Sequence, residues 1–154
     1  MKAENENIDF ESSIGPWLGK TVKIVDYYLQ EALRNQDLDL TKEQMVVLKK
    51  LHDLDGLNQN ELAFLTLRNK SSLTRLLRKM ENKKYISRKQ SVEDKRVNNV
   101  FLTKYGREVF KKTRPIIKQI IDIMEDNISN KEKEKTISLL KKIQFNFTST
   151  KASL

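Results

Sequence analysis

The sequence predicts a mainly α-helical protein with one small β-hairpin. Three observations indicate this. The 154 residues include only four glycines and two prolines, which is too few for a turn-rich β fold. Most apolar residues recur at the three- and four-residue spacing of amphipathic helices. Residues 85–102 instead contain two short runs with weak alternation around a polar loop, which is typical of a hairpin.

Two helices are expected in the first third of the chain. Pro16 suits a first helical turn, where its missing N–H is not needed, and an apolar series follows it, so a helix is predicted over 15–35. The sequence TKEQ at 41–44 matches a capping box, in which the first and fourth side chains bond each other's backbone N–H groups. A second helix therefore begins there and ends before Asp55-Gly56.

A short helix and a longer one follow. The sequence NQNE at 58–61 resembles another cap, and Asn69 can cap a helix predicted over 70–83. One face of that helix is a predicted buried stripe, formed by Leu73, Leu76, Leu77 and Met80. The opposite face carries hydroxyls, an amide and cations, namely Ser71, Thr74, Arg75, Arg78 and Asn82. No acidic residue lies between Lys70 and Met80, whereas solvated helix faces usually pair acids with bases.

The remainder predicts two strands and two helices. Strands are expected at 85–90 and 99–102, on either side of a loop at 91–98. Thr103 caps a long helix predicted over 104–127, which Pro115 should bend because proline cannot donate the helical hydrogen bond. The sequence SNKE at 129–132 is a further capping box that begins the last helix.

Positive charge is concentrated in the middle of the chain. Residues 1–67 carry 7 basic and 12 acidic side chains, residues 68–112 carry 15 and 4, and residues 113–154 carry 8 and 5. The net charge of +9 therefore arises mainly from the segment that contains the 70–83 helix and the hairpin. Such a cluster is the electrostatic signature of a nucleic-acid-binding surface. Lysines that only maintain solubility have no reason to gather in one segment.

The hairpin loop supports the same interpretation. Asp94 precedes Arg96 by two positions and can hold that arginine extended, and an extended guanidinium suits a narrow DNA minor groove. Lys70 begins the preceding helix, where a phosphate would meet the helix dipole. A reading helix followed by a basic wing is the arrangement of a winged helix-turn-helix that binds double-stranded DNA. The basic residues predicted for the wing surface are Arg88, Lys89, Lys95 and Arg96.

The end helices predict a dimer. They carry more isoleucine and leucine than so small a monomer can bury, so a second copy would cover them, although an intramolecular core remains the alternative. The predicted fold class is mainly α, a winged helix-turn-helix with a β-hairpin wing and a helical dimerisation region. Its predicted parts are a disordered tail at 1–12, the dimerisation region at 13–36 and 104–148, the DNA-binding lobe at 37–103 and a second disordered tail at 149–154.

Three stretches resemble the MarR (multiple-antibiotic-resistance) family of bacterial transcription regulators, and the resemblance covers nearly the whole chain. They are Leu62-Ala63, residues 71–77, and residues 94–106, which match the family's D-x-R…L-T-x-x-G signature. The resemblance implies an obligate dimer that reads a pseudo-palindrome. By position it places Arg96 in the minor groove, oriented by Asp94. By the same comparison, five residues would face the major groove, namely Ser71, Ser72, Thr74, Arg75 and Arg78.

Regulation is the least defined part of the prediction. The family often responds to small aromatic ligands, and a cleft for such an effector could be lined by Trp17, Tyr27, Tyr28 and His52. Aromatic residues at helical spacing more often belong to the hydrophobic core than to a ligand site. Residues 64–68 are more apolar than family members often show, which leaves the base preference open.

Other functions find little support in the composition. Without cysteine and with one histidine, thiol chemistry and histidine-rich metal sites are excluded, and we expect no cofactor. Without a glycine-rich phosphate loop or a carboxylate cluster, nothing can be given a catalytic role. No apolar run approaches the ~20 residues of a membrane span, so a cytoplasmic protein is expected. The alternative function is a winged helix that contacts only proteins.

Overall fold

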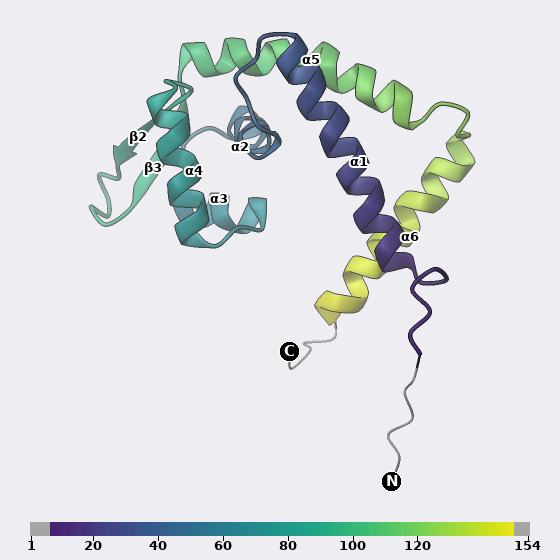
Figure 1. Cartoon of the computed structure of the whole chain (residues 1–154). Helices are drawn as coiled ribbons and strands as arrows, with labels where there is room; N and C mark the ends of the chain where they lie inside the picture. The colour runs from purple at the N-terminus through teal and green to yellow at the C-terminus, as the bar shows by residue number, and fades with distance from the viewer. Residues whose placement is uncertain (1–6, 150–154) are drawn as a thin grey trace. The chain divides into compact units, whose positions relative to one another are not determined.

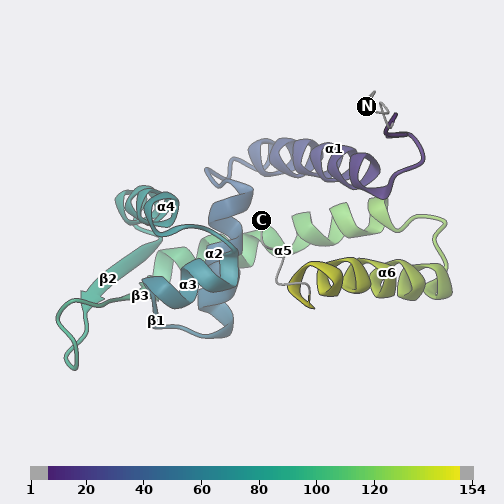
Figure 2. The ribbon, with the colours of Figure 1, turned by 90° about the horizontal axis from the view of Figure 1, so that it is seen from below.

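The computed structural model describes residues 7–149, which divide into two compact units between Lys118 and Gln119. Six helices and three strands are present in the described part, and all of them are labelled in Figure 2; Figure 1 shows the same chain from another side. They are α1 (Ile14–Asn35), α2 (Lys42–Asp53), β1 (Leu57–Asn58), α3 (Gln59–Thr66), α4 (Lys70–Asn82), β2 (Ile86–Gln90), β3 (Asn98–Leu102), α5 (Lys104–Met124) and α6 (Asn130–Ser149). The mainly helical winged helix-turn-helix fold is confirmed.

The capping residues predicted from the sequence begin the helices. The Thr41 hydroxyl accepts the backbone N–H of Gln44, whose side chain accepts the N–H of Thr41 in return. Asn58 and Glu61 form the same reciprocal pair at α3. These local hydrogen bonds satisfy backbone donors that a helix start otherwise leaves without a partner, and they stabilise the short α3.

The sheet has a third strand that the sequence did not predict. Its order is β1-β3-β2, with both pairs antiparallel, and Leu57 of β1 lies opposite Val100 of β3. A strand of two residues shows no alternation, and its partner lies more than 40 positions later, so no local pattern could predict it. The β2–β3 hairpin projects beyond α3 and α4, as Figure 2 shows.

The core of the first unit lies beneath α4 and the sheet. The predicted stripe of α4 is confirmed, since Leu73, Leu76, Leu77 and Met80 are all buried. They pack in one cluster with residues of α2, α3, the strands and α5, which include Leu48, Leu51, Leu62, Val100 and Phe110. With its apolar face held in this cluster, α4 presents its polar face to solvent.

The hairpin joins α5 through a close backbone contact. The Thr103 hydroxyl donates to Lys84 O at 2.6 Å and accepts the N–H of Gly106 at 2.9 Å. The backbone N–H of Thr103 donates to Tyr85 O at 3.1 Å. A Cβ at Gly106 would lie 2.0 Å from that same Tyr85 oxygen. The threonine and the glycine of the motif thus allow α5 to begin against the end of the α4–β2 turn.

Some boundaries differ from the prediction. Helix α5 ends at Met124 rather than 127, because Asn127 adopts a left-handed backbone with φ +57° that interrupts a helix. Pro115 lies inside α5, and its bend stays a prediction. Of the tail predicted at 1–12, residues 1–6 lie outside the described residues, while Asp9 accepts hydrogen bonds from Ser12 and closes a turn. At the other end, residue 149 belongs to α6, and 150–154 lie outside the described residues.

The second unit is described by itself. The predicted capping box at its last helix is present, since Ser129 N–H donates to Glu132 at 2.9 Å and Glu132 N–H donates to the Ser129 hydroxyl at 3.1 Å. These hydrogen bonds to Ser129 lower the pKa of Glu132. Within the described range, no residue of α6 is buried.

Candidate nucleic-acid interface

The outward face of α4 is cationic and hydroxylic, as predicted. Lys70, Ser71, Arg75 and Arg78 are exposed, and Ser72 and Thr74 are half-buried. The Ser71 hydroxyl donates to the side-chain oxygen of Asn69 at 2.9 Å, and that of Thr74 donates to Lys70 O at 2.8 Å. Each hydroxyl oxygen keeps acceptor capacity toward a donor that approaches from outside. The face can therefore offer both donors and acceptors to base edges and phosphates.

A polar groove of about 200 Å³ joins α4 to the wing. It is lined by residues of α3, α4 and the hairpin, namely Gln59, Asn60, Lys70, Leu73, Thr74, Arg96, Val97 and Asn98. The Gln59 amide donates to the Thr74 hydroxyl at 3.5 Å. Sequence reasoning missed Gln59, Asn60 and Asn98 as members of this surface. The run of amides at the start of α3 was the available signal, but it was interpreted only as a helix cap.

The wing tip holds Arg96 outward. Asp94 accepts the backbone N–H of Arg96 at 3.0 Å, its Nε at 3.2 Å and its Nη2 at 3.4 Å. The hydrogen bonds to Arg96 lower the pKa of Asp94, so the carboxylate stays charged. The Arg96 side chain is nevertheless 90% exposed. The predicted pairing is therefore present, and it leaves the guanidinium open to solvent.

The other wing residues divide into two groups. Lys89 and Lys95 are exposed, and Lys89 Nζ lies 5.6 Å from the centre of the Phe101 ring. Arg88, also predicted as a DNA contact, is paired within the lobe. Its Nε and Nη2 donate to the two carboxylate oxygens of Glu81 at 3.1 and 3.0 Å, and its side chain is only 23% exposed. A charge paired in this way ties β2 to α4 and is not presented to a ligand.

We expect Glu81→Gln to reduce stability without reducing DNA affinity beyond about twofold. Hydrogen bonding to Arg88 lowers the pKa of Glu81 below its ordinary value of 4.5, so the ion pair stabilises the folded state above pH 4.5. This contribution is lost as the pH falls through the lowered pKa of the folded protein. Urea denaturation should show a deficit of about 0.5–1 kcal/mol at pH 7 for this half-exposed pair, closing in acid. An equal deficit at every pH would contradict the assignment.

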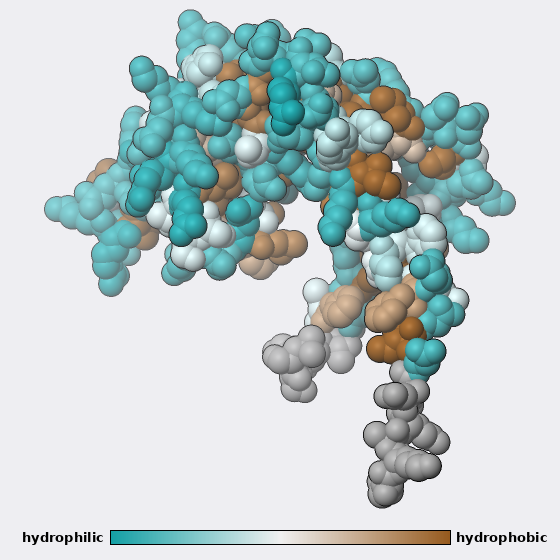
Figure 3. All heavy atoms as spheres, in the orientation of Figure 1, coloured by the Kyte–Doolittle hydropathy of each residue, from teal (hydrophilic) through white to brown (hydrophobic). Residues whose placement is uncertain are grey.

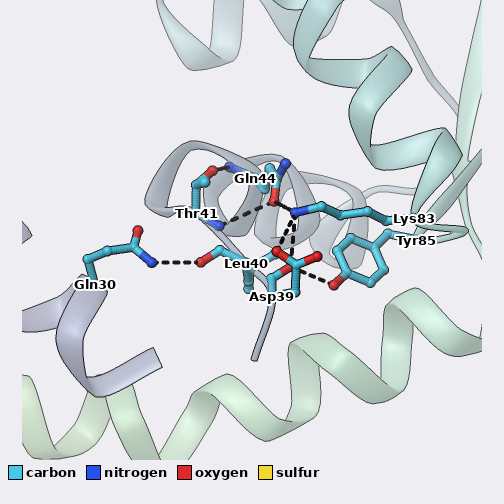
Figure 4. A network of polar contacts seen from close by, with 7 residues as sticks. All are labelled: Gln30, Asp39, Leu40, Thr41, Gln44, Lys83 and Tyr85. Atoms are coloured by element: carbon cyan, nitrogen blue, oxygen red, sulfur yellow. Dashed lines mark hydrogen bonds and ion pairs between the residues drawn. The ribbon is translucent and has the colours of Figure 1, made fainter. Parts of the chain in front are cut away.

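The base of α4 is fixed by a polar network, drawn in Figure 4. Lys83 Nζ donates to Asp39 O at 3.1 Å, to Asp39 Oδ1 at 2.9 Å and to Oε1 of the buried Gln44 at 3.1 Å. The Tyr85 hydroxyl donates to Asp39 O at 2.6 Å, and burial, followed by the Asp39 charge, raises the pKa of Tyr85. Gln30 of α1 donates to Leu40 O at 3.2 Å. The α1–α2 connection is thereby bonded to both α1 and the end of α4.

Of the four residues predicted for an effector cleft, two line the groove along α1. Tyr27 and Tyr28 lie edge to face at 5.4 Å and line a groove along α1 with Pro16, Gly19, Lys20, Lys23 and Ile24. Trp17 does not line this groove, and its indole N–H donates to Glu11 O at 2.9 Å. His52 packs against Phe110 at 4.9 Å between ring centres. Helical spacing could not show this, because it says nothing of which elements meet.

A metal site and a membrane-spanning helix are both absent from the part of the chain that the structure describes. Across residues 7–149, no three histidine or acidic side chains are placed to hold a metal ion. No helix that the structure describes is long and apolar enough to cross a membrane.

The fold and this surface define a winged helix-turn-helix protein of the DNA-binding class, and known proteins agree. The MarR family model matches residues 40–97. Transcriptional regulator HosA of Escherichia coli O157:H7 is 30% identical over 105 residues, which cover 68% of this chain and 78% of HosA. The chain belongs to the MarR family and is a DNA-binding transcriptional regulator rather than an enzyme.

Solved structures show the same fold. BpsR of Bordetella bronchiseptica superposes with a TM-score of 0.81 at 21% identity, over 89% of this chain and 96% of BpsR. The transcriptional repressor CouR, bound to a 23-mer DNA duplex, superposes with a TM-score of 0.80 at 21% identity, over 87% of this chain and 94% of CouR.

Proposed function

We propose that this regulator is a homodimeric repressor that binds a pseudo-palindromic operator. Helix α4 enters the major groove with Ser71, Arg75 and Arg78, and Arg96 enters the adjacent minor groove. The observation that carries the proposal is the Arg96 side chain, which is 90% exposed, is held by Asp94, and lines one groove with Lys70 and Thr74 of α4. Arginine is favoured in narrow minor grooves because the negative potential there is enhanced.

Exposed apolar residues support the dimer. On α1 they are Ile14, Trp17, Val22, Ile24, Tyr27 and Tyr28, and on α6 they are Ile137, Leu139, Phe145 and Phe147. Apolar surface of this extent is unfavourable in water and is typical of an interface. A two-fold axis would place two copies of α4 about 34 Å apart, one turn of DNA, which suits two symmetric half-sites.

Repression and a response to a small aromatic effector have separate support. CouR is a repressor found on a DNA duplex, and DNA binding by BpsR is regulated by 6-hydroxynicotinic acid. In this chain the tyrosine pair of α1 lines a groove with two lysines, which suits an aromatic acid. Such a ligand would release DNA only if it binds the DNA-competent and DNA-incompetent dimers with different affinity.

Selection from a library of random duplexes at two salt concentrations tests the DNA-binding proposal. We expect one enriched palindrome with half-sites about one turn apart. If about six to ten phosphates are neutralised, affinity should fall roughly 10³–10⁵-fold between 50 and 200 mM salt. Weak binding without an enriched motif would contradict operator recognition. The absence of binding at both salts would instead favour the winged helix that contacts only proteins.

The dimer is tested by sedimentation of the full chain. Wild-type protein is expected to sediment with twice the monomer mass, and Leu139→Asp on α6 should shift it toward the monomer because a buried unpaired carboxylate is costly. The matched control is Lys141→Asp, which introduces the same group at an exposed polar position of the same helix. A wild-type monomer at all accessible concentrations would refute the dimer.

A further inference from the structure

The turn between α3 and α4 exposes apolar side chains. Phe64 is 80% exposed, Leu67 is 93% exposed and Leu65 is 41% exposed. We call Phe64, Leu65 and Leu67 the α3–α4 corner. In the space-filling view of Figure 3, a brown patch is visible at the lower edge of an otherwise mostly hydrophilic lobe, near the end of α3 in Figure 1.

Leu67 is unfavourable in the free protein for two independent reasons. It caps α3 in the left-handed conformation, with φ 55° and ψ 37°, which glycine adopts without strain and a side chain does not. It also leaves almost its whole apolar surface in water. A strained backbone position that gains no burial in return points to a role outside the folding of the lobe.

The corner directly precedes the start of α4 in the chain. Leu67 precedes Asn69, the cap of α4, by two positions, and Arg68 and Lys70 flank that cap. Between residues 58 and 80 the only acidic residue is Glu61, whose carboxylate is engaged at the start of α3. The Nε of Arg68 is buried and has no hydrogen-bond partner among the described residues. The surroundings of the corner therefore suit a polyanion rather than a basic partner.

We propose that Phe64 and Leu67 contact DNA and pack against thymine methyl groups at the edge of the major groove that α4 occupies. The C5 methyl of thymine is the one apolar group that a base pair presents there, and an apolar side chain is its natural partner. The proposal rests on the proposed function, because it requires α4 to lie in the major groove. It assigns part of the base preference to a turn rather than to the reading helix.

Uracil substitution in the selected operator tests the contact, since it removes only the methyl group. Each thymine is replaced singly, and binding is measured for wild-type protein, Leu67→Gly and Phe64→Ala. At one or two positions per half-site we expect wild-type affinity to fall about fourfold, the effect of one buried methyl. The same substitutions should change the affinity of Leu67→Gly by less than about 1.5-fold.

Measurements on Leu67→Gly also distinguish loss of a DNA contact from a change in protein stability. Relief of the left-handed strain should raise its Tm by about 2–4 °C, while its operator affinity falls. A residue with a purely structural role cannot show opposite signs in the two measurements. The matched control is Leu54→Ala, at a leucine 63% exposed at the end of α2, which should bind every duplex as wild type does.

The outcomes are distinguishable. If an operator is selected but both corner variants bind it with wild-type affinity, the contact is refuted while the proposed function stands, and the corner is then a surface for another protein. If Leu67→Gly binds more weakly than wild type but both lose the same affinity on uracil substitution, the methyl contact is refuted. If no operator is selected, the proposed function itself fails, and the corner proposal fails with it.

Discussion

Arg96→Ala is expected to weaken operator binding by about 10- to 100-fold at physiological salt. The estimate corresponds to about 1–3 kcal/mol for an arginine that contacts bases. The Arg96 side chain is 90% exposed, and its hydrogen bonds go to Asp94 rather than to the core. Loss of affinity should therefore occur without loss of stability or change of oligomeric mass, which fluorescence anisotropy and sedimentation can establish on the same samples.

Lys95→Ala is the matched control for Arg96. It removes one neighbouring cation that Asp94 does not hold, so a loss of one phosphate contact is the most it should cause. That loss should be similar on operator and random DNA, whereas the loss with Arg96→Ala should be larger on the operator. If Arg96→Ala binds the operator with wild-type affinity, the proposed contact between the wing and the minor groove is refuted.

Gly106→Ala is expected to destabilise the fold by about 2–4 kcal/mol, a large effect for one methyl group. The added Cβ would lie 2.0 Å from the oxygen of Tyr85 and 2.9 Å from its carbonyl carbon. These are backbone atoms held by the Thr103 N–H and cannot rotate away. Relief requires α5 to move from the hairpin, so DNA affinity should fall as well. Urea denaturation measures the first effect and anisotropy the second.

Gly19→Ala is the control for Gly106→Ala and should change stability in the opposite direction. Apart from the adjacent backbone of α1, nothing lies within 4 Å of a Cβ built there, and the residue is in the interior of α1. Alanine should raise the free energy of unfolding by about 0.5–1 kcal/mol, because glycine loses more conformational freedom in a helix. Equal stability of Gly106→Ala and wild type would mean that α5 does not approach Tyr85 as closely as described.

Features set by neighbours in the chain were predictable. The capping boxes at Thr41 and Ser129, the buried face of α4 and the pairing of Asp94 with Arg96 all depend on residues within a few positions of each other. Helical periodicity and capping chemistry act over that range. These features were sufficient to predict the winged helix-turn-helix fold.

Features that depend on long-range contacts were missed. β1 exists because β3 pairs with it, and the pairing of Arg88 with Glu81 requires β2 to fold back on α4. Both arginines of the hairpin looked alike in sequence, yet a carboxylate from α4 neutralises one of them. The contact of His52 with Phe110 has the same origin, since it requires α2 to lie against α5.

The network at the base of α4 has a mechanical consequence. Two donors from the end of α4, Lys83 Nζ and the Tyr85 hydroxyl, share the carbonyl oxygen of Asp39, and Gln30 of α1 bonds the next carbonyl along the chain. The connection between α1 and α2 is therefore hydrogen-bonded on both sides, which restricts its conformation. We infer that these bonds would pass a tilt of α1 on to α4, so that side chains outside the proposed interface would influence how α4 meets a duplex.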